Sequence, residues 1–409
     1  MRLTNTQFCP SIARNSRKHV MFRSTIARLV FRLNQVSSYL LYAIYCSLWV
    51  AVVGGDGNLQ TSGSGLPLKE NCDGLWLKPL SNRSDEYKSK CSCTQTTVSC
   101  INLQMVPAAP SFRTKQKDDT DFFLQLEDRR FGYLEEVTIH GNNLERLPSH
   151  LFGPSVNHDR LLRLNLSANY FIHVTNKALV GMPRLEMLDL SENEIFLTEN
   201  DTHFFEPVPN LRRLYLVKAF SYGQPKGEQL RNLVAALDSA KLQRLEQLYI
   251  GSNYFEEFPG TIGCSLPSLK ILSFSRNNPR KWPIPPNCYG NLQMLDLSVS
   301  NFETKSGESV LDRSFVDFIQ KLPSKTKVRL SWSTIRCDCT IRTFQTWLNV
   351  TNRVVDKQEV ICDSAHQHRP LLEIEPEDLS CVTSESSRLI SGHFLALANL
   401  LTVWLLLYC

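Results

Sequence analysis

Apolar residues recur through the middle of the chain in a fixed template, L-x-x-L-x-L-x-x-N-x-L. The first copy consists of Leu134, Val137, Ile139, Asn142 and Leu144, and copies follow about every 23 to 34 residues. The remaining copies begin at Leu161, Leu185, Leu211, Leu245, Leu269 and Leu292, and an eighth is read at Val328 and Leu330. Ala219 replaces the Asn of the fourth copy, and Ser300 and Ser333 replace it in the last two.

Each position of the template has a physical reading. The x-L-x-L segment predicts a short strand, because side chains alternate between the two faces of a strand. The Asn amide can bond backbone groups where the chain leaves the strand, so successive Asn residues predict a ladder between coils. Self-similarity at this period is typical of a leucine-rich repeat. We therefore expect an α/β solenoid, a horseshoe whose concave face is a parallel sheet of about eight coils over residues 131–336.

One stretch of the solenoid departs from the repeat. Residues 219–227 (AFSYGQPKG) are rich in turn formers, and the apolar residues that follow take helical spacing. Those residues are Leu230, Leu233, Val234 and Leu237. We predict that the repeats are interrupted over residues 219–241, with a helix inside the interruption.

Ten of the 13 cysteines fall in three groups. Two groups of four flank the repeats, and predict an N-terminal cap over 72–130, which includes a charged insertion, and a C-terminal cap over 337–381. An even number of cysteines in a secreted chain indicates disulfides. A zinc site is the competing reading, but the close pairs are C-x-C and zinc sites favour C-x2-4-C. Cys264 and Cys288 lie about one repeat apart, either as a further bridge on adjacent coils or as two buried thiols.

Both ends of the chain predict export to a membrane. Residues 1–38 contain seven basic side chains and no acidic one, and residues 39–53 are uncharged. This layout is typical of a cleaved secretory signal over 1–55, followed by a linker over 56–71; a mitochondrial transit peptide and a retained signal anchor are the alternatives. Residues 382–409 read as a polar spacer and an apolar tail, which favours a glycolipid anchor over a single membrane span. We expect the protein on the extracellular side of the plasma membrane.

Charge and motifs narrow the class of function. Without its seven leader cations the formal net charge of +5 falls to about −2, which argues against nucleic-acid binding. The sequence has no H-E-x-x-H, G-x-S-x-G, P-loop or G-x-G-x-x-G motif, so we expect no enzyme, no catalytic residue, no metal and no cofactor. Four N-glycosylation sequons, which favour the secretory route, begin at Asn82, Asn165, Asn200 and Asn349.

The interruption and the C-terminal cap resemble segments of a known protein family. Three segments resemble the trophoblast glycoprotein family, and the resemblance covers residues 91–381. They are RNLVAALDSAKLQRLEQLYIGSNYFEEFP, which begins inside the interruption, and CDCTIRTFQTWLNV and VICDSAHQHRPLLEIEPEDLSC in the C-terminal cap. The resemblance implies a glycosylated cell-surface protein that inhibits or modulates Wnt/β-catenin signalling. An adhesion or matrix-binding receptor without a Wnt role is the alternative. Analogy with other capped repeats implies the pairs Cys72–Cys93, Cys91–Cys100, Cys337–Cys362 and Cys339–Cys381.

Repeat proteins bind partners on their extended concave surface, so we look there for a binding site. Aromatic and Arg side chains contribute most to binding energy at interfaces. The template places such residues near the centre of the predicted sheet, and an ordinary solvated face is the alternative. The predicted partner-binding residues are Arg213, Tyr215, Tyr249, Arg163, Asp189 and Gln247. We expect the partner to be an extracellular or cell-surface protein, such as a Wnt pathway component.

Overall fold

The computed structural model describes part of the chain in detail. The described residues are 91–101, 126, 131–142, 144–155, 157–283, 287–304, 307, 309–333, 335–363 and 368–379. The predicted signal region 1–55, the linker 56–71, the anchor tail 382–409, Cys72, Cys381 and Asn82 lie outside them. All described residues belong to one compact unit.

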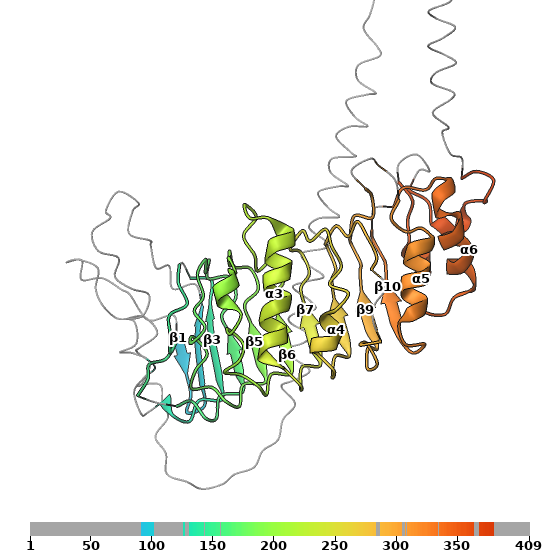
Figure 1. Cartoon of the computed structure of the whole chain (residues 1–409). Helices are drawn as coiled ribbons and strands as arrows, with labels where there is room; N and C mark the ends of the chain where they lie inside the picture. Colours follow the sequence, from blue (N-terminus) through green and yellow to red (C-terminus); the bar gives the residue numbers. More distant parts are fainter. Residues whose placement is uncertain are drawn as a thin grey trace, which may run out of the picture. The chain divides into compact units, whose positions relative to one another are not determined.

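One sheet runs the length of this unit, and its ten strands in the described part follow each other in chain order (Figure 1). Each of the eight predicted repeats supplies one strand, all parallel, which confirms the predicted fold. These strands are β3 (Glu136–His140), β4 (Arg163–Asn165), β5 (Met187–Asp189), β6 (Arg213–Tyr215), β7 (Gln247–Tyr249), β8 (Ile271–Ser273), β9 (Met294–Asp296) and β10 (Lys327–Arg329).

The strands expose one face and bury the other. In β4 to β7 the central leucine is buried and the residues on either side of it are half-exposed, as the alternation of strand side chains requires. Those central leucines are Leu164, Leu188, Leu214 and Leu248, each with no accessible surface. Burying a leucine contributes roughly 2 kcal/mol. The half-exposed first and third residues of β4–β7 and β9 form what we call the open sheet face.

Buried asparagines connect the coils where the chain leaves each strand. Asn253 donates from Nδ2 to the carbonyl oxygen of Ile250 in its own coil (3.0 Å) and to that of Leu216 in the previous coil (2.8 Å). Its Oδ1 accepts from the Ala219 N–H at 2.9 Å, and its own N–H donates to Oδ1 of Asn277 at 3.1 Å. Asn169 and Asn193 likewise donate from Nδ2 to carbonyl oxygens of their own and the previous coil, and the Asn169 N–H donates to Oδ1 of Asn193. The predicted ladder is therefore present.

The interruption contains α3 (Lys226–Ala240), as the spacing of its apolar residues predicts. Leu230, Leu233 and Leu237 are buried in the core. The helix packs between η4 (Glu199–Asp201) and α4 (Ile262–Ser265), which belong to neighbouring coils. Buried Gln229 exchanges two hydrogen bonds with the backbone of Leu197, at 2.9 and 3.1 Å. The insertion is thus accommodated behind the sheet, and strands β6 and β7 remain neighbours.

A hairpin closes the N-terminal edge of the sheet. β1 (Cys91–Cys93) and β2 (Thr97–Ile101) are antiparallel, and β2 then pairs in parallel with β3. Val98 and Cys100 of β2 are fully buried and extend the core. The first coil therefore has a partner for both its backbone and its apolar face.

Helices and short turns close the other end, one helix directly before β10 in the chain and the others after it (Figure 1). They are α5 (Arg313–Lys321), η5 (Cys339–Ile341), α6 (Arg342–Val350), η6 (Lys357–Glu359) and η8 (Leu371–Glu373). The carboxylate of Asp356 accepts from the backbone N–H groups of Leu330 and Ser331, which follow β10. Phe315 of α5 meets Trp282 and Phe344 with ring centroids 4.8 and 5.6 Å apart. As at the N-terminal end, the backbone groups and the apolar surface at this edge of the solenoid are both covered.

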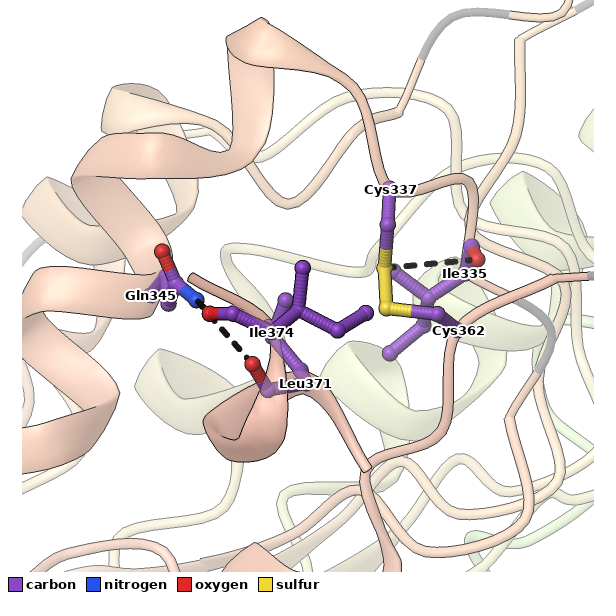
Figure 2. Close-up of a disulfide and its surroundings, with 6 residues drawn as sticks. All are labelled: Ile335, Cys337, Gln345, Cys362, Leu371 and Ile374. Atoms are coloured by element: carbon purple, nitrogen blue, oxygen red, sulfur yellow. Dashed lines mark hydrogen bonds between the residues drawn. A yellow bond between two sulfur atoms is a disulfide. The ribbon is translucent and has the colours of Figure 1, made fainter. Parts of the chain in front are cut away.

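Disulfides hold these ends and one middle pair of coils. The bridges are Cys91–Cys100 and Cys337–Cys362, as expected, and Cys264–Cys288, which is the first of the two alternatives for that pair. Cys93 and Cys339 are also disulfide-bonded, and the pairs Cys72–Cys93 and Cys339–Cys381 stay predictions because one member of each lies outside the described residues. Figure 2 shows the C-terminal bridge and, across Leu371 and Ile374 from it, Gln345, whose Nε2 donates to the carbonyl oxygens of Leu371 (3.0 Å) and Ile374 (2.6 Å).

Asn253→Ala tests the ladder. The substitution removes four hydrogen bonds to buried backbone groups, and we expect it to lower the free energy of unfolding by roughly 3 kcal/mol. Chemical denaturation of the full chain measures the loss. Asn210→Ala is the control, since half-buried Asn210 makes one solvent-exposed bond, to the carbonyl oxygen of Pro183, and it should change stability by less than about 0.5 kcal/mol. Equal effects of the two substitutions would contradict a structural ladder.

The double substitution Cys337→Ser/Cys362→Ser tests the C-terminal cap. The two cysteines are 25 residues apart, and chain-entropy reasoning predicts a loss of about 3 kcal/mol. Cys264→Ser/Cys288→Ser opens a loop of similar length, with a separation of 24 residues, and serves as the matched comparison. Thermal unfolding without reductant measures both variants. A cap variant that unfolds like the wild type would show that the bridge does not stabilise the fold.

Buried His158 predicts a pH dependence of stability. It is 2% exposed and its ring lies against that of Phe152, with centroids 5.1 Å apart. Burial lowers the pKa of His158 in the folded state, so below about pH 6.5 the unfolded chain takes up a proton that the folded chain does not. Stability should therefore fall as the pH drops from 7 to 5, with a slope from this group of at most about 1.4 kcal/mol per pH unit. His158→Leu should flatten the slope in acid denaturation, and exposed His173→Gln should not.

Candidate functional site

Two stacked tyrosines occupy the centre of the open sheet face. Tyr215 of β6 and Tyr249 of β7 are register partners, and their rings are parallel within 5° with centroids 4.6 Å apart. Partial burial raises the pKa of both phenols. Tyr249 donates from its hydroxyl to Oε1 of Gln247 at 3.2 Å. The stack forms although α3 separates the two strands in sequence, because the helix lies behind the sheet.

Polar residues surround the stack on the neighbouring strands. Arg213 and Gln247 lie two residues before the tyrosines on β6 and β7 and are register partners of each other. Asp189 of β5 is the register partner of Tyr215. Oδ1 of Asp189 accepts from the Ser191 N–H at 2.8 Å. Desolvation by burial raises the pKa of Asp189. A cation, a carboxylate and two aromatic rings therefore meet on three adjacent strands, as the template places them.

Arg163 lies away from this group. It belongs to β4, and its guanidinium donates to Oε2 of Glu136 at 2.8 and 3.0 Å. β5 separates it from the tyrosines. The two residues of this ion pair are 27 positions apart in sequence, and they meet because the register of the coils places them opposite each other on β3 and β4. Of the six residues predicted to bind a partner, the structure brings five together, and their role in binding stays a prediction.

Further charges along the start of β6 to β8 were not predicted from the sequence. Glu246 precedes β7 and pairs with Arg212 at 2.8 Å and with Lys270 at 3.1 Å. Each of these residues directly precedes a strand, and the repeat leaves that position unspecified. They form a polar border along one edge of the open sheet face.

Three predicted glycosylation sites fall within the described residues. Asn200 and Asn349 are exposed. Asn165 is the last residue of β4, and its Oδ1 accepts from the N–H and hydroxyl of Ser167 at 2.9 and 2.7 Å. A glycan on Asn165 Nδ2 would leave the opposite, β7 side of the stack accessible. Whether these sites are modified stays a prediction.

Exposed aromatic residues in the turns after the strands were also missed by sequence reasoning. Tyr222 and Tyr254 are 74% and 49% exposed, and their rings meet edge to face at 5.2 Å. Nζ of Lys226 lies 5.6 and 5.9 Å from the two ring centroids. A signal for this cluster was available, since Tyr254 directly follows the ladder residue Asn253.

Within the described ranges, no three His, Cys, Asp or Glu side chains are grouped so as to hold a metal ion. Nor does any helix in that part of the chain have the length and apolar character needed to cross a bilayer.

The parallel sheet, the ladder and the disulfide-bonded ends define a capped leucine-rich repeat protein. A leucine-rich repeat family model matches residues 132–195 and, overlapping them, 159–218. The chain is similar to trophoblast glycoprotein of Macaca fascicularis, with 25% identity over 309 residues that span 73% of this chain and 68% of the relative. These findings confirm the resemblance to the trophoblast glycoprotein family.

A solved structure agrees with that likeness. The crystal structure of human trophoblast glycoprotein, also named Wnt-activated inhibitory factor 1, matches with a TM-score of 0.57 and 25% identity. The match covers 73% of this chain and all of the solved chain. Human Toll-like receptor 5 is 25% identical over 226 residues, which are 54% of this chain and 23% of the receptor. The relatives are thus leucine-rich repeat proteins named as a glycoprotein and a receptor.

Proposed function

We propose that the protein is a cell-surface glycoprotein that binds a protein partner through the centre of its open sheet face and thereby inhibits or modulates Wnt/β-catenin signalling. The observation that carries the binding proposal is the Tyr215–Tyr249 stack with Arg213 beside it. The name of the human relative, Wnt-activated inhibitory factor 1, supports the choice of pathway. The protein acts in this proposal by contact and without a chemical step.

The stack is suited to binding for two physical reasons. Tyrosine and arginine are enriched among the residues that dominate interface energies. The two rings already hold each other in the free protein, so little side-chain entropy is lost when a partner covers them. Asp189 and Arg213 offer charges of both signs beside the rings, which favours a partner with complementary charges.

A glycan placed on the open sheet face tests this proposal. Asp189→Asn creates the sequon Asn-Leu-Ser at the register partner of Tyr215, and an Asn side chain retains an oxygen to accept from the Ser191 N–H. The attached glycan should block the partner and abolish the reduction of a Wnt reporter that the wild-type protein causes. Tyr215→Ala/Tyr249→Ala should weaken the reduction at least tenfold in dose, since each hot-spot residue contributes about 2 kcal/mol or more.

Ser324→Asn is the matched control, because it creates the sequon Asn-Lys-Thr at an exposed residue outside the sheet. It should gain a glycan and keep full reporter activity. Surface expression of every variant is measured in parallel. A reporter that responds equally to the wild type and to the Asp189→Asn variant would reject this face. No reporter response to the wild type, together with cell aggregation, would favour an adhesion receptor instead.

A further inference from the structure

A shallow depression of about 350 Å³ lies on the turns that follow strands β6 to β9. Its volume is within the range of ligand-binding pockets, about 300–1,000 Å³. Four consecutive coils contribute to it, from Lys218 in the fourth repeat to Asn301 in the seventh. The lining residues are Lys218, Ser252, Tyr254, Arg276, Asn278, Val299, Ser300 and Asn301.

The lining carries two cations beside polar side chains, with apolar surface at Tyr254 and Val299. Lys218 and Arg276 are exposed, and neither forms an ion pair with another described residue. No carboxylate is among the lining residues. Lys226 adds a third cation nearby, with Nζ 5.9 Å from the ring centroid of Tyr254. Two lining cations without an ion-pair partner among the described residues attract an anionic group and are free to bind it.

The backbone of these turns holds the lining side chains at some cost. Lys218, Ser252, Arg276 and Val299 each directly precede the ladder position and have φ between 53° and 58°. This left-handed region favours glycine, and other residues lose roughly 1–2 kcal/mol there. Tyr254 is also left-handed, with φ of 59°. The same conformation precedes the ladder position in the other coils, at Ala168, Glu192 and Trp332, so it belongs to the repeat and sets the four lining residues at equivalent places in successive turns.

The chemistry of the lining selects the ligand class. We infer that the depression binds an anionic saccharide unit of a sulfated polysaccharide. The cations Lys218 and Arg276 suit sulfate or carboxylate groups, with the guanidinium able to donate two parallel hydrogen bonds. The hydroxyl and amide groups of Ser252, Asn278 and Asn301 match sugar hydroxyls. The exposed face of Tyr254 offers a flat apolar surface for a sugar ring.

An acidic peptide fits the lining less well. Protein interfaces depend on an apolar core of buried anchors, and only Tyr254 and Val299 of the lining residues offer apolar surface. The site is separate from the Tyr215–Tyr249 stack, which lies on the strands and not on the turns. The inference therefore stands independently of the proposed signalling role, and loss of one activity need not affect the other.

Binding of the full-length, detergent-solubilised protein to immobilised heparin at 0.15 M salt tests the site. Lys218→Gln/Arg276→Gln should weaken binding about tenfold, since it removes two charge-assisted contacts. Arg184→Gln/Lys325→Gln removes the same charge from exposed positions elsewhere and should keep most of the affinity. Tyr254→Ala should weaken binding roughly fivefold, and Tyr254→Phe should not, because the ring is retained.

Competition separates a saccharide site from a simple basic patch. Desulfated heparin and poly-glutamate should compete poorly with immobilised heparin. The inference is overturned if the Lys218→Gln/Arg276→Gln variant binds like the wild type, if Tyr254→Ala has no effect, or if poly-glutamate competes as well as heparin at equal charge. Thermal unfolding of each variant, which should match the wild type, shows that any loss of binding is local.

Discussion

No coil of this solenoid can bury its own apolar face, so each coil depends on the next one for both apolar contacts and hydrogen bonds. The asparagine ladder is where that dependence is most specific. Asn253, for example, donates to a carbonyl oxygen of its own coil and to one of the coil before it, and it accepts from the Ala219 N–H of that previous coil. Its own N–H donates to Asn277 in the coil after it. The fourth coil lacks the amide, since Ala219 occupies the ladder position, but its N–H still donates to Asn253. The ends of such a stack have no further neighbour, and the hairpin β1–β2 and the helical C-terminal cap take that place.

The same constraint positions the candidate surfaces. Because the register of the strands is fixed by the coils, insertions must leave the sheet undisturbed, and α3 does so by packing beside η4 and α4. Tyr215 and Tyr249 are 34 residues apart in the chain yet stack on adjacent strands. The turns repeat with equal regularity, so Lys218, Ser252, Arg276 and Val299 occupy equivalent places in four coils. A repeating backbone thus gathers residues that are far apart in sequence into continuous surfaces.

Much of this fold could be predicted from the sequence because the repeat specifies it. The buried leucines, the ladder asparagines, the helix at Leu230–Leu237 and three of the disulfides follow from spacing or from likeness to other capped repeats. The template does not specify the residue type at its other positions, so the contacts of those side chains could not be predicted. The pairing of Arg163 with Glu136, the Tyr222–Tyr254–Lys226 cluster and the depression at Arg276 each depend on how coils of unequal length align side chains across the stack. The burial of His158 likewise depends on a loop outside the template.

Hydrogen exchange of the intact chain, resolved to individual peptides, tests most directly whether the ladder joins the coils into one cooperative unit. The amides of Asn169, Ala219 and Asn253 donate to ladder side chains, so they should exchange only through the opening that exposes the buried strands. Their protection should then equal that of Leu188, Leu214 and Leu248 and should fall together with it in denaturant. Ladder amides that exchange many times faster than the strands would show that the sheet and the apolar contacts hold the coils together without the ladder, and would contradict this account.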